Sequence, residues 1–182
     1  RGGPVATRGA SSSPSFAADT CMQLLRLYAH ATDAATATTT GQPLARVVSP
    51  VGTSPIALDY ALAWHLLMAL RTSDAAAAGA LGDDVDFDTF HAVAHGFSCQ
   101  LEAEGLWPWA VYVLLRQLDH PAASEEDVEA CCREVISRHA ADLDARGGGS
   151  ARAAEATSFL TTRLGVPRAW VDAAVATHAV YE

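Results

Sequence analysis

Two histidines four residues apart, His91 and His95, have the spacing of metal ligands on a helix. Residues separated by four positions share one helix face, which is how paired histidines approach a zinc ion. The zinc protease pattern needs a glutamate directly after the first histidine, and this chain has Ala92 there. The pattern therefore favours two ordinary histidines over a zinc site.

An acidic run before these histidines resembles the opening of a calcium-binding loop. The run contains four aspartates: Asp83, Asp84, Asp86 and Asp88. If Asp84 held the first loop position, the required glycine would be Thr89 and the required final glutamate would be His95. We therefore interpret the run as a solvated loop, in which Asp86 or Asp88 caps the helix that follows.

The cysteines and the remaining carboxylates offer no stronger site. Cys131 and Cys132 point about 100° apart on a helix, and with His139 they lack the paired spacing of a zinc knuckle. We expect one of the two cysteines in the core and the other exposed. Asp59 lies near a predicted helix start, where the helix dipole favours a carboxylate. Because the sequence also lacks P-loop, dinucleotide-binding and nucleophile-elbow motifs, we predict no catalytic, cofactor-binding or metal-binding residue and no enzyme.

The composition is that of an acidic globular protein. Hydrophobic residues make up 50% of the chain and charged residues 18%, against a usual charged share of about 25%. The net charge of −9 repels nucleic acid and anionic lipid, so neither is an expected partner. The longest apolar runs, 61–70 and 106–115, are shorter than the ~20 residues of a membrane span. The four cysteines show no disulfide framework, which indicates a reducing compartment.

Apolar spacing predicts an all-α chain of about seven helices in an antiparallel stack. Residues 1–14 are predicted to be a flexible lead-in, and residues 15–182 to form part of one helical domain. Because the chain does not begin with methionine, we expect it to be an excerpt of a longer protein. Linkers are predicted near residues 34–53, 73–85 and 145–151, and residues 44–48 are expected to dock as an extended segment.

Capping residues set the expected helix boundaries. Ser54 before Pro55 predicts a helix that runs to about Thr72, and the cap at Asp86 or Asp88 one that ends near Gly105. Further helices are predicted over 106–118, over 124–143, up to Gly165, and from Pro167 to the chain end. The helices over 55–72 and 106–118 are apolar on every side, so we expect other helices to surround them. The predicted core contains Leu58, Tyr60, Leu62, Trp64, Leu67, Leu101, Leu106, Trp107, Trp109, Val111, Leu114, Phe159, Leu164 and Trp170.

Four stretches carry a resemblance to a known family: 58–66 (LDYALAWHL), 100–115 (QLEAEGLWPWAVYVLL), 133–139 (REVISRH) and 159–171 (FLTTRLGVPRAWV). In order and spacing they resemble the C-terminal scaffold product of the autoproteolytic nucleoporin precursor, the ninety-six-kilodalton member of the Y-shaped coat complex. The resemblance covers about 54–182. The chain departs from the family at Ala61, at Pro108 and in inserts at 75–82 and 146–150, which concern loops and surface contacts more than the fold.

The resemblance implies a fold-back, α-solenoid-like block of the ancestral coatomer element type. It also implies a structural role in the nuclear pore complex at the nuclear envelope, with indirect support of mRNA and protein transport. The implied partners are other Y-complex nucleoporins and, through parts of the family not matched here, the coat β-propeller subunit shared with COPII. The family's His-Phe-Ser self-cleavage site is only superficially similar to residues 95–98, where a glycine is inserted within a predicted helix.

Three alternatives stay open at this stage. The first is a vesicle-coat scaffold subunit of the same architecture. The second is a helical metal-dependent enzyme that uses residues 83–88 with His91 and His95. The third is an adaptor that binds a partner helix in an apolar groove.

Overall fold

The computed structural model describes residues 20–22, 24, 25, 29, 47–50, 56, 58–72, 86–144 and 150–181. Within these ranges the regular structure is helical and no strand occurs, so the all-α prediction is confirmed. The predicted lead-in (1–14), the linker over 73–85 and residues 145–149 lie outside the described residues, as do Asp83 and Asp84.

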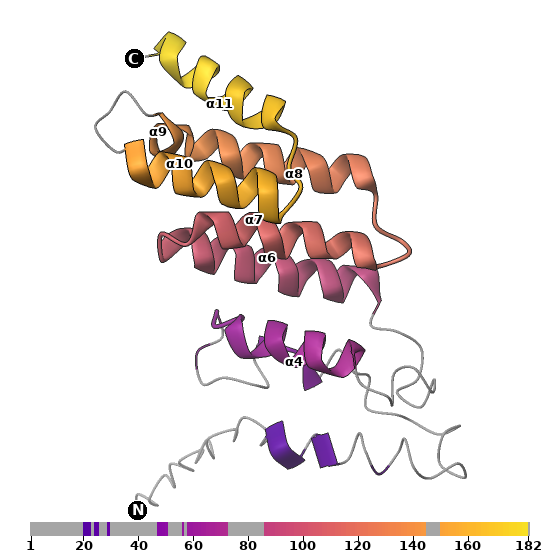
Figure 1. The fold of residues 1–182 in the computed structure, drawn as a ribbon. Coiled ribbons are helices and arrows are strands. Elements are labelled where there is room, and N and C mark those ends of the chain that lie inside the picture. The colour runs from indigo at the N-terminus through magenta and orange to yellow at the C-terminus, as the bar shows by residue number, and fades with distance from the viewer. Residues whose placement is uncertain are drawn as a thin grey trace, which may run out of the picture.

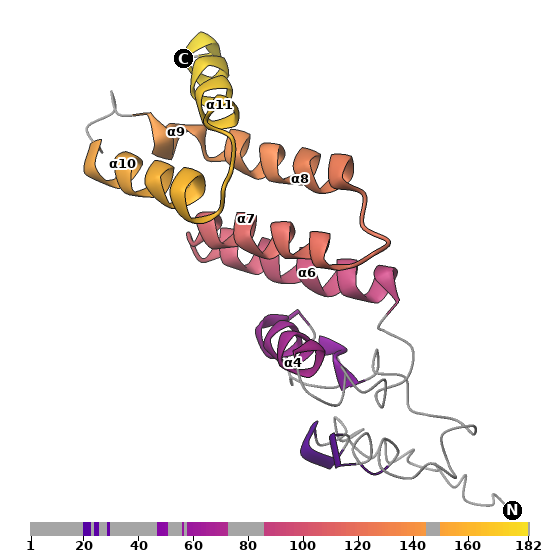
Figure 2. The same cartoon turned by 45° about the vertical axis from the view of Figure 1, so that its right-hand side comes forward.

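The helices are piled on one another in chain order (Figure 1). Helix α4 (Ala61–Arg71) packs against α6 (Phe87–Ala103), which forms a hairpin with α7 (Trp107–Leu115). Helix α8 (Glu125–Arg138) lies on α7, and α11 (Arg168–Tyr181) lies on α8. The turned view in Figure 2 shows the same succession from α4 to α11, so consecutive helices form layers of one stack.

Shorter elements complete the upper half of the stack. A 3₁₀ turn, η1 (Arg116–Asp119), follows α7, and the short helix α9 (Ala140–Leu143) follows α8. Helix α10 (Ser150–Ser158) continues into a π-helical turn, η3 (Phe159–Arg163). Because α10 packs on α9 and η3 touches α7, this pair lies beside the α7–α8 layer.

Local sequence explains where several helices begin and end. Asp86 caps the start of helix α6: its carboxylate accepts hydrogen bonds from the amide (2.8 Å) and hydroxyl (3.0 Å) of Thr89. Ser124 caps α8 in the same way by accepting a bond from the amide of Asp127 (3.3 Å). Gly105 has φ +76°, which lets the chain reverse between α6 and α7 because glycine adopts the left-handed conformation without strain. These boundaries agree with the predicted ones.

The predicted start of α4 at Ser54 and Pro55 is wrong by several residues. These two residues lie outside the described ranges, but Leu58, Asp59 and Tyr60 are not helical and α4 begins at Ala61. The first free backbone donors are satisfied there: the Asp59 carboxylate accepts a bond from the Ala61 amide (3.2 Å), and the Gln100 side-chain oxygen accepts one from the Tyr60 amide (3.0 Å). One of these two partners is therefore local, and the other comes from α6.

The helix predicted over 124–143 is divided. Helix α8 ends at Arg138, and α9 begins at Ala140 after His139, which has φ −105° and ψ 22°. The helix predicted over 106–118 likewise stops at Leu115 and tightens into η1. Residue type alone does not mark either change.

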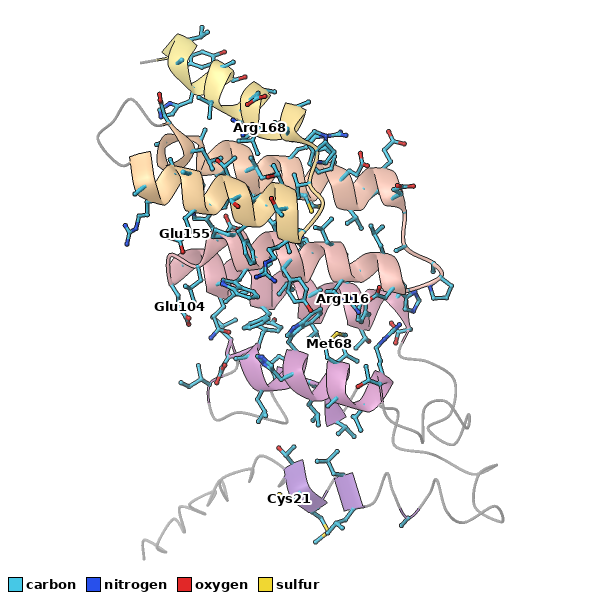
Figure 3. The ribbon with its side chains drawn as sticks, viewed as in Figure 1. Cys21, Met68, Glu104, Arg116, Glu155 and Arg168 are labelled. Carbon is cyan, nitrogen blue, oxygen red and sulfur yellow. The ribbon has the colours of Figure 1, made fainter. Side chains whose placement is uncertain are left out.

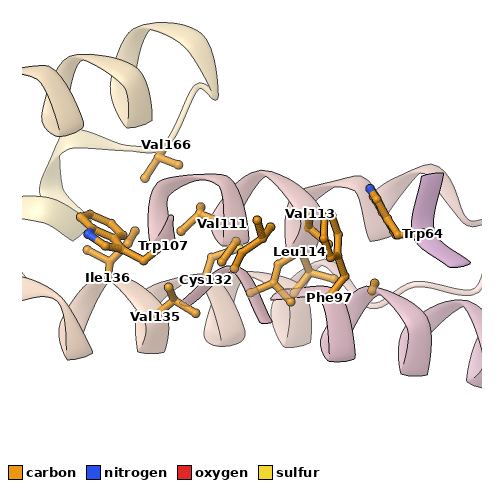
Figure 4. Close-up of a cluster of buried hydrophobic side chains, with 14 of the residues drawn as sticks. Trp64, Phe97, Trp107, Val111, Val113, Leu114, Cys132, Val135, Ile136 and Val166 are labelled. Atoms are coloured by element: carbon orange, nitrogen blue, oxygen red, sulfur yellow. The ribbon is translucent and has the colours of Figure 1, made fainter. Parts of the chain in front are cut away.

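One continuous core joins the layers. Its buried residues come from α4 (Trp64, Leu67), α6 (Phe97, Leu101), α7 (Trp107, Val111, Leu114), α8 (Cys132, Val135, Ile136) and the segment before α11 (Val166), as Figure 4 shows for most of them. Val47 and Val48 are also fully buried, although Val47 is helical and not extended as expected. Among the other predicted core residues, Tyr60, Leu164 and Trp170 are half-buried and pack against this core, and Phe159 is half-buried.

Four predicted core residues are instead exposed: Leu58 (76%), Leu62 (46%), Leu106 (45%) and Trp109 (51%). Leu58 precedes α4, and Leu62 lies on the helix face opposite the buried Ala63, Trp64 and Leu67. The expectation that other helices surround α4 and α7 is therefore wrong, because each helix buries only part of its apolar circumference within the described residues.

Candidate interaction surface

Among the described residues that were considered for metal chemistry, His91, His95 and Asp86 make contacts within the stack. The Nδ1 atom of His91 lies 2.7 Å from the side-chain oxygen of Gln117, which is buried, and Nδ1 of His95 lies 3.9 Å from the sulfur of Cys99. Asp86 is the cap of α6, and hydrogen bonds from Thr89 lower the pKa of its carboxyl. In the described part of the chain no three His, Cys, Asp or Glu residues are grouped so that they could hold a metal ion.

The adjacent cysteines occupy different environments. Cys132 is fully buried between helices, and burial raises the pKa of its thiol to about 12. Cys131 is partly buried, and burial also raises its thiol pKa. A raised pKa keeps both sulfurs as thiols at neutral pH, so neither is an activated nucleophile.

His139 belongs to an ionic cluster rather than to a cysteine site. The Glu102 carboxylate accepts bonds from Nε (3.1 Å) and Nη2 (2.9 Å) of Arg138, and Nε2 of His139 lies 3.3 Å from the same carboxylate. The hydrogen bond from Arg138 to Glu102 raises the pKa of the guanidinium. On its other side the imidazole stacks on Trp107, with ring centroids 5.1 Å apart and planes 3° apart. The cluster therefore ties the ends of α6 and α8 to the first turn of α7.

The segment that resembles a self-cleavage site lies within helix α6. Phe97 and Ser98 lie in the middle of α6 and are 8% and 1% exposed. The segment is packing surface.

Exposed aromatic side chains gather along the outer face of α7 and beside α10. Trp109 contacts the ring of Phe159 (centroids 4.8 Å apart) and that of Tyr112 (6.0 Å). Here the chain forms a groove of about 610 Å³, which we name the α7–α10 groove. It is lined by Glu104, Gly105, Leu106, Trp107, Pro108, Trp109, Asp142, Arg152, Glu155, Ala156 and Phe159.

The rim of this groove is acidic. Glu104 at the end of α6 and Glu155 on α10 face it from opposite sides, and Figure 3 shows both at the same edge of the molecule. Asp142 of α9 adds a third carboxylate, against the single guanidinium of Arg152. Sequence reasoning assigned Leu106, Trp109 and Phe159 to the core and so missed the groove, because periodicity counts apolar residues without showing which ones a neighbour covers.

No helix in the described ranges is long and apolar enough to cross a membrane. The fold and its surface are thus those of an all-α helical stack that carries an exposed aromatic groove. Residues 4–178 match the family described as Nuclear protein 96 (Nup96), and the chain belongs to this family. Its place is therefore among the nucleoporins, at the nuclear pore complex of the nuclear envelope.

Two curated relatives carry the name "Nuclear pore complex protein Nup98-Nup96". The one from Dictyostelium discoideum is 31% identical over 125 residues, which cover 69% of this chain and 5% of the relative. The one from Drosophila melanogaster is 28% identical over 136 residues, which cover 75% of this chain and 6% of the relative. The chain thus corresponds to a small part of these much longer proteins.

Proposed function

We propose that the chain is a scaffold segment of the Y-shaped coat of the nuclear pore complex, which joins neighbouring nucleoporins and supports nucleocytoplasmic transport indirectly. The observation that carries this proposal is the continuous core that runs from α4 to α11 while large aromatic side chains stay outside it. A protein that holds partners in place needs both a stiff body and exposed contact surface.

The stiffness comes from side chains that interlock successive layers. Phe90 of α6, Leu114 of α7 and Ile136 of α8 have almost no exposed surface, so a shift of one helix against the next would open cavities. Neighbouring helices therefore move together, and the chain holds its contact surfaces at fixed positions relative to one another. We propose accordingly that it is not an enzyme.

Its proposed partners are other scaffold nucleoporins of the Y complex. The coat β-propeller shared with COPII would bind through regions outside this chain. Family membership supports a nuclear pore role over a vesicle-coat role for the same architecture.

The test is affinity purification of the tagged chain from nuclear envelopes, combined with imaging of its location. We expect a nuclear rim signal and recovery of Y-complex subunits well above vesicle-coat subunits. Preferential recovery of vesicle-coat subunits, or a diffuse signal from the folded protein, would contradict the proposal. The destabilised variant Trp107→Ala serves as the control for loss of the folded stack.

A further inference from the structure

We propose that the α7–α10 groove binds a segment of a partner protein that carries an arginine or lysine beside apolar side chains. In this arrangement the cationic group lies over Trp109, with Glu104 and Glu155 as its counter-charges. The inference rests on the proposed scaffold role and specifies the chemistry of one partner.

The apolar half of the groove is unusually exposed for a folded chain. Trp109 is 51% and Leu106 is 45% exposed, and the exposed ring of Tyr112 contacts that of Trp109. Contiguous apolar surface rimmed by polar groups is typical of interaction sites, where tryptophan and tyrosine contribute most of the binding free energy. Apolar side chains of a partner would remove this surface from water.

The charged half selects the partner. Three carboxylates against one guanidinium give the rim a net charge of about −2, within a chain of net charge −9. In the described part of the chain, the arginine ion pairs use other carboxylates: Asp119, Glu129, Glu102, Glu134 and Asp172. Glu104 accepts one hydrogen bond, from the side-chain amide of Gln100 to its Oε1 (3.3 Å), and neither Glu104 nor Glu155 pairs with an arginine of the described residues. Both carboxylates therefore keep their negative charge available for a cation of a partner.

An aromatic ring beside carboxylates is a favourable place for a guanidinium or ammonium group. The face of an indole attracts a cation within about 6 Å, and the interaction strengthens when water is excluded. The chain already shows this contact elsewhere, because the guanidinium of Arg133 lies 4.4 Å from the centre of the Trp170 ring. Trp109 offers the same chemistry at the groove, where the rim carries more carboxylates than guanidinium groups and a partner can supply the cation.

Other occupants fit less well. Nucleic acid and acidic segments would bring negative charge to a negative rim. A purely apolar segment would desolvate the carboxylates without giving them a partner. A second copy of this chain in a symmetric dimer would place two acidic rims against each other.

The experiment measures binding of two labelled helical peptides of about 16 residues by fluorescence anisotropy. Both carry a leucine stripe, which is flanked by arginines in one peptide and by glutamates in the other. We expect the 182-residue chain to bind the arginine peptide and not the glutamate peptide. Trp109→Ala should weaken binding about tenfold, whereas Tyr181→Ala, at an 85% exposed aromatic on α11, should leave it unchanged.

A charge reversal distinguishes the effect of the groove on peptide binding from the effect of the net charge of the chain. Glu155→Arg should lower the affinity of the chain for the arginine peptide about tenfold, and binding of the glutamate peptide should become measurable. The matched control is Glu125→Arg, on the exposed first turn of α8, which makes the same change in net charge. It should change the affinity for either peptide by no more than about twofold. Melting curves of all variants verify that the stack is folded.

Equal effects of the two reversals, equal binding of both peptides, or tight binding that survives Trp109→Ala would overturn the inference. Sedimentation that reveals a dimer dissolved by Trp109→Ala would also overturn it and identify the occupant as a second copy. These outcomes are distinct from failure of the scaffold proposal. If the chain reaches the nuclear rim but does not bind the peptides as expected, only the groove inference is refuted. If the folded chain never reaches the rim, the scaffold role is refuted.

Discussion

At the scale of single residues, two tryptophans show how position outweighs residue type. Trp107 and Trp109 are two positions apart on α7, yet they point to different faces of the helix. Trp107 is 4% exposed and stacks on His139, whereas Trp109 is 51% exposed and borders the groove. The first therefore serves stability, and we assign the second to binding.

This difference predicts a contrast in stability. Trp107→Ala should lower the free energy of unfolding by about 3 to 5 kcal/mol, because it leaves a cavity and removes the stack on His139. Trp109→Ala should lower the free energy of unfolding by only about 1 kcal/mol, since half of the Trp109 side chain is already exposed to water. Urea denaturation of both variants measures the contrast. Equal losses would mean that the two side chains do not occupy these two environments in solution.

The alkaline behaviour of the chain should report on Cys132. Between about pH 9 and about 12 the folded state keeps a proton on this thiol that the unfolded chain has released. The free energy of unfolding should therefore fall as pH rises through this window, by up to about 1.4 kcal/mol per pH unit. All twelve basic residues are arginines, so no lysine titrates in the same range.

Urea denaturation at several alkaline pH values measures this slope. Cys132→Ala should flatten it, whereas Cys99→Ser, at an exposed cysteine, should leave it unchanged. An unchanged slope in Cys132→Ala would assign the alkaline loss to other groups.

At the scale of elements, the contact between α4 and α6 depends on a glycine inside a helix. A β-carbon at Gly96 would lie 2.6 Å from ring carbons of Tyr60, the residue that precedes α4. The Tyr60 amide is also held by Gln100 of α6, one turn beyond Gly96. The close approach of the two elements therefore requires the absence of a side chain at this position.

Gly96→Ala should consequently destabilise the stack by about 1 kcal/mol net. Alanine gains about 1 kcal/mol in helix propensity, but overpacking against the Tyr60 ring costs about 1 to 3 kcal/mol. In a Tyr60→Ala background the same substitution should become stabilising, which a double-mutant cycle measures. A stabilising Gly96→Ala in the native background would show that the ring moves aside freely.

At the scale of the whole molecule, the stack buries its core between layers and leaves large aromatic side chains such as Trp109 exposed. The core is continuous from α4 to α11. Several of the described acidic side chains act as caps or in ion pairs, as Asp86 and Glu102 do. Metal binding is therefore not expected to contribute to folding or function.

Calcium, magnesium and zinc should accordingly leave the melting temperature unchanged and give no stoichiometric heat in calorimetric titration. A site saturated at 100 times its dissociation constant would stabilise the fold by about 2.7 kcal/mol, a shift that is easily detected. Tight binding by the native chain, lost in His91→Ala with His95→Ala, would revive the metal-enzyme alternative.

The sequence by itself determined the fold class and most helix boundaries, because caps and breakers act within a few residues. The side chains of Asp86 and Ser124 accept hydrogen bonds from amides three residues away, and Gly105 reverses the chain through its own positive φ. These effects depend only on nearby residues, so the sequence reveals them. Only the tertiary structure decided how the chain enters α4, since the amide of Tyr60 donates to the side chain of Gln100, forty residues away. It also decided that Leu62 and Trp109 are exposed. Apolar spacing records how much surface a helix could bury, and only packing against neighbours determines which part is buried.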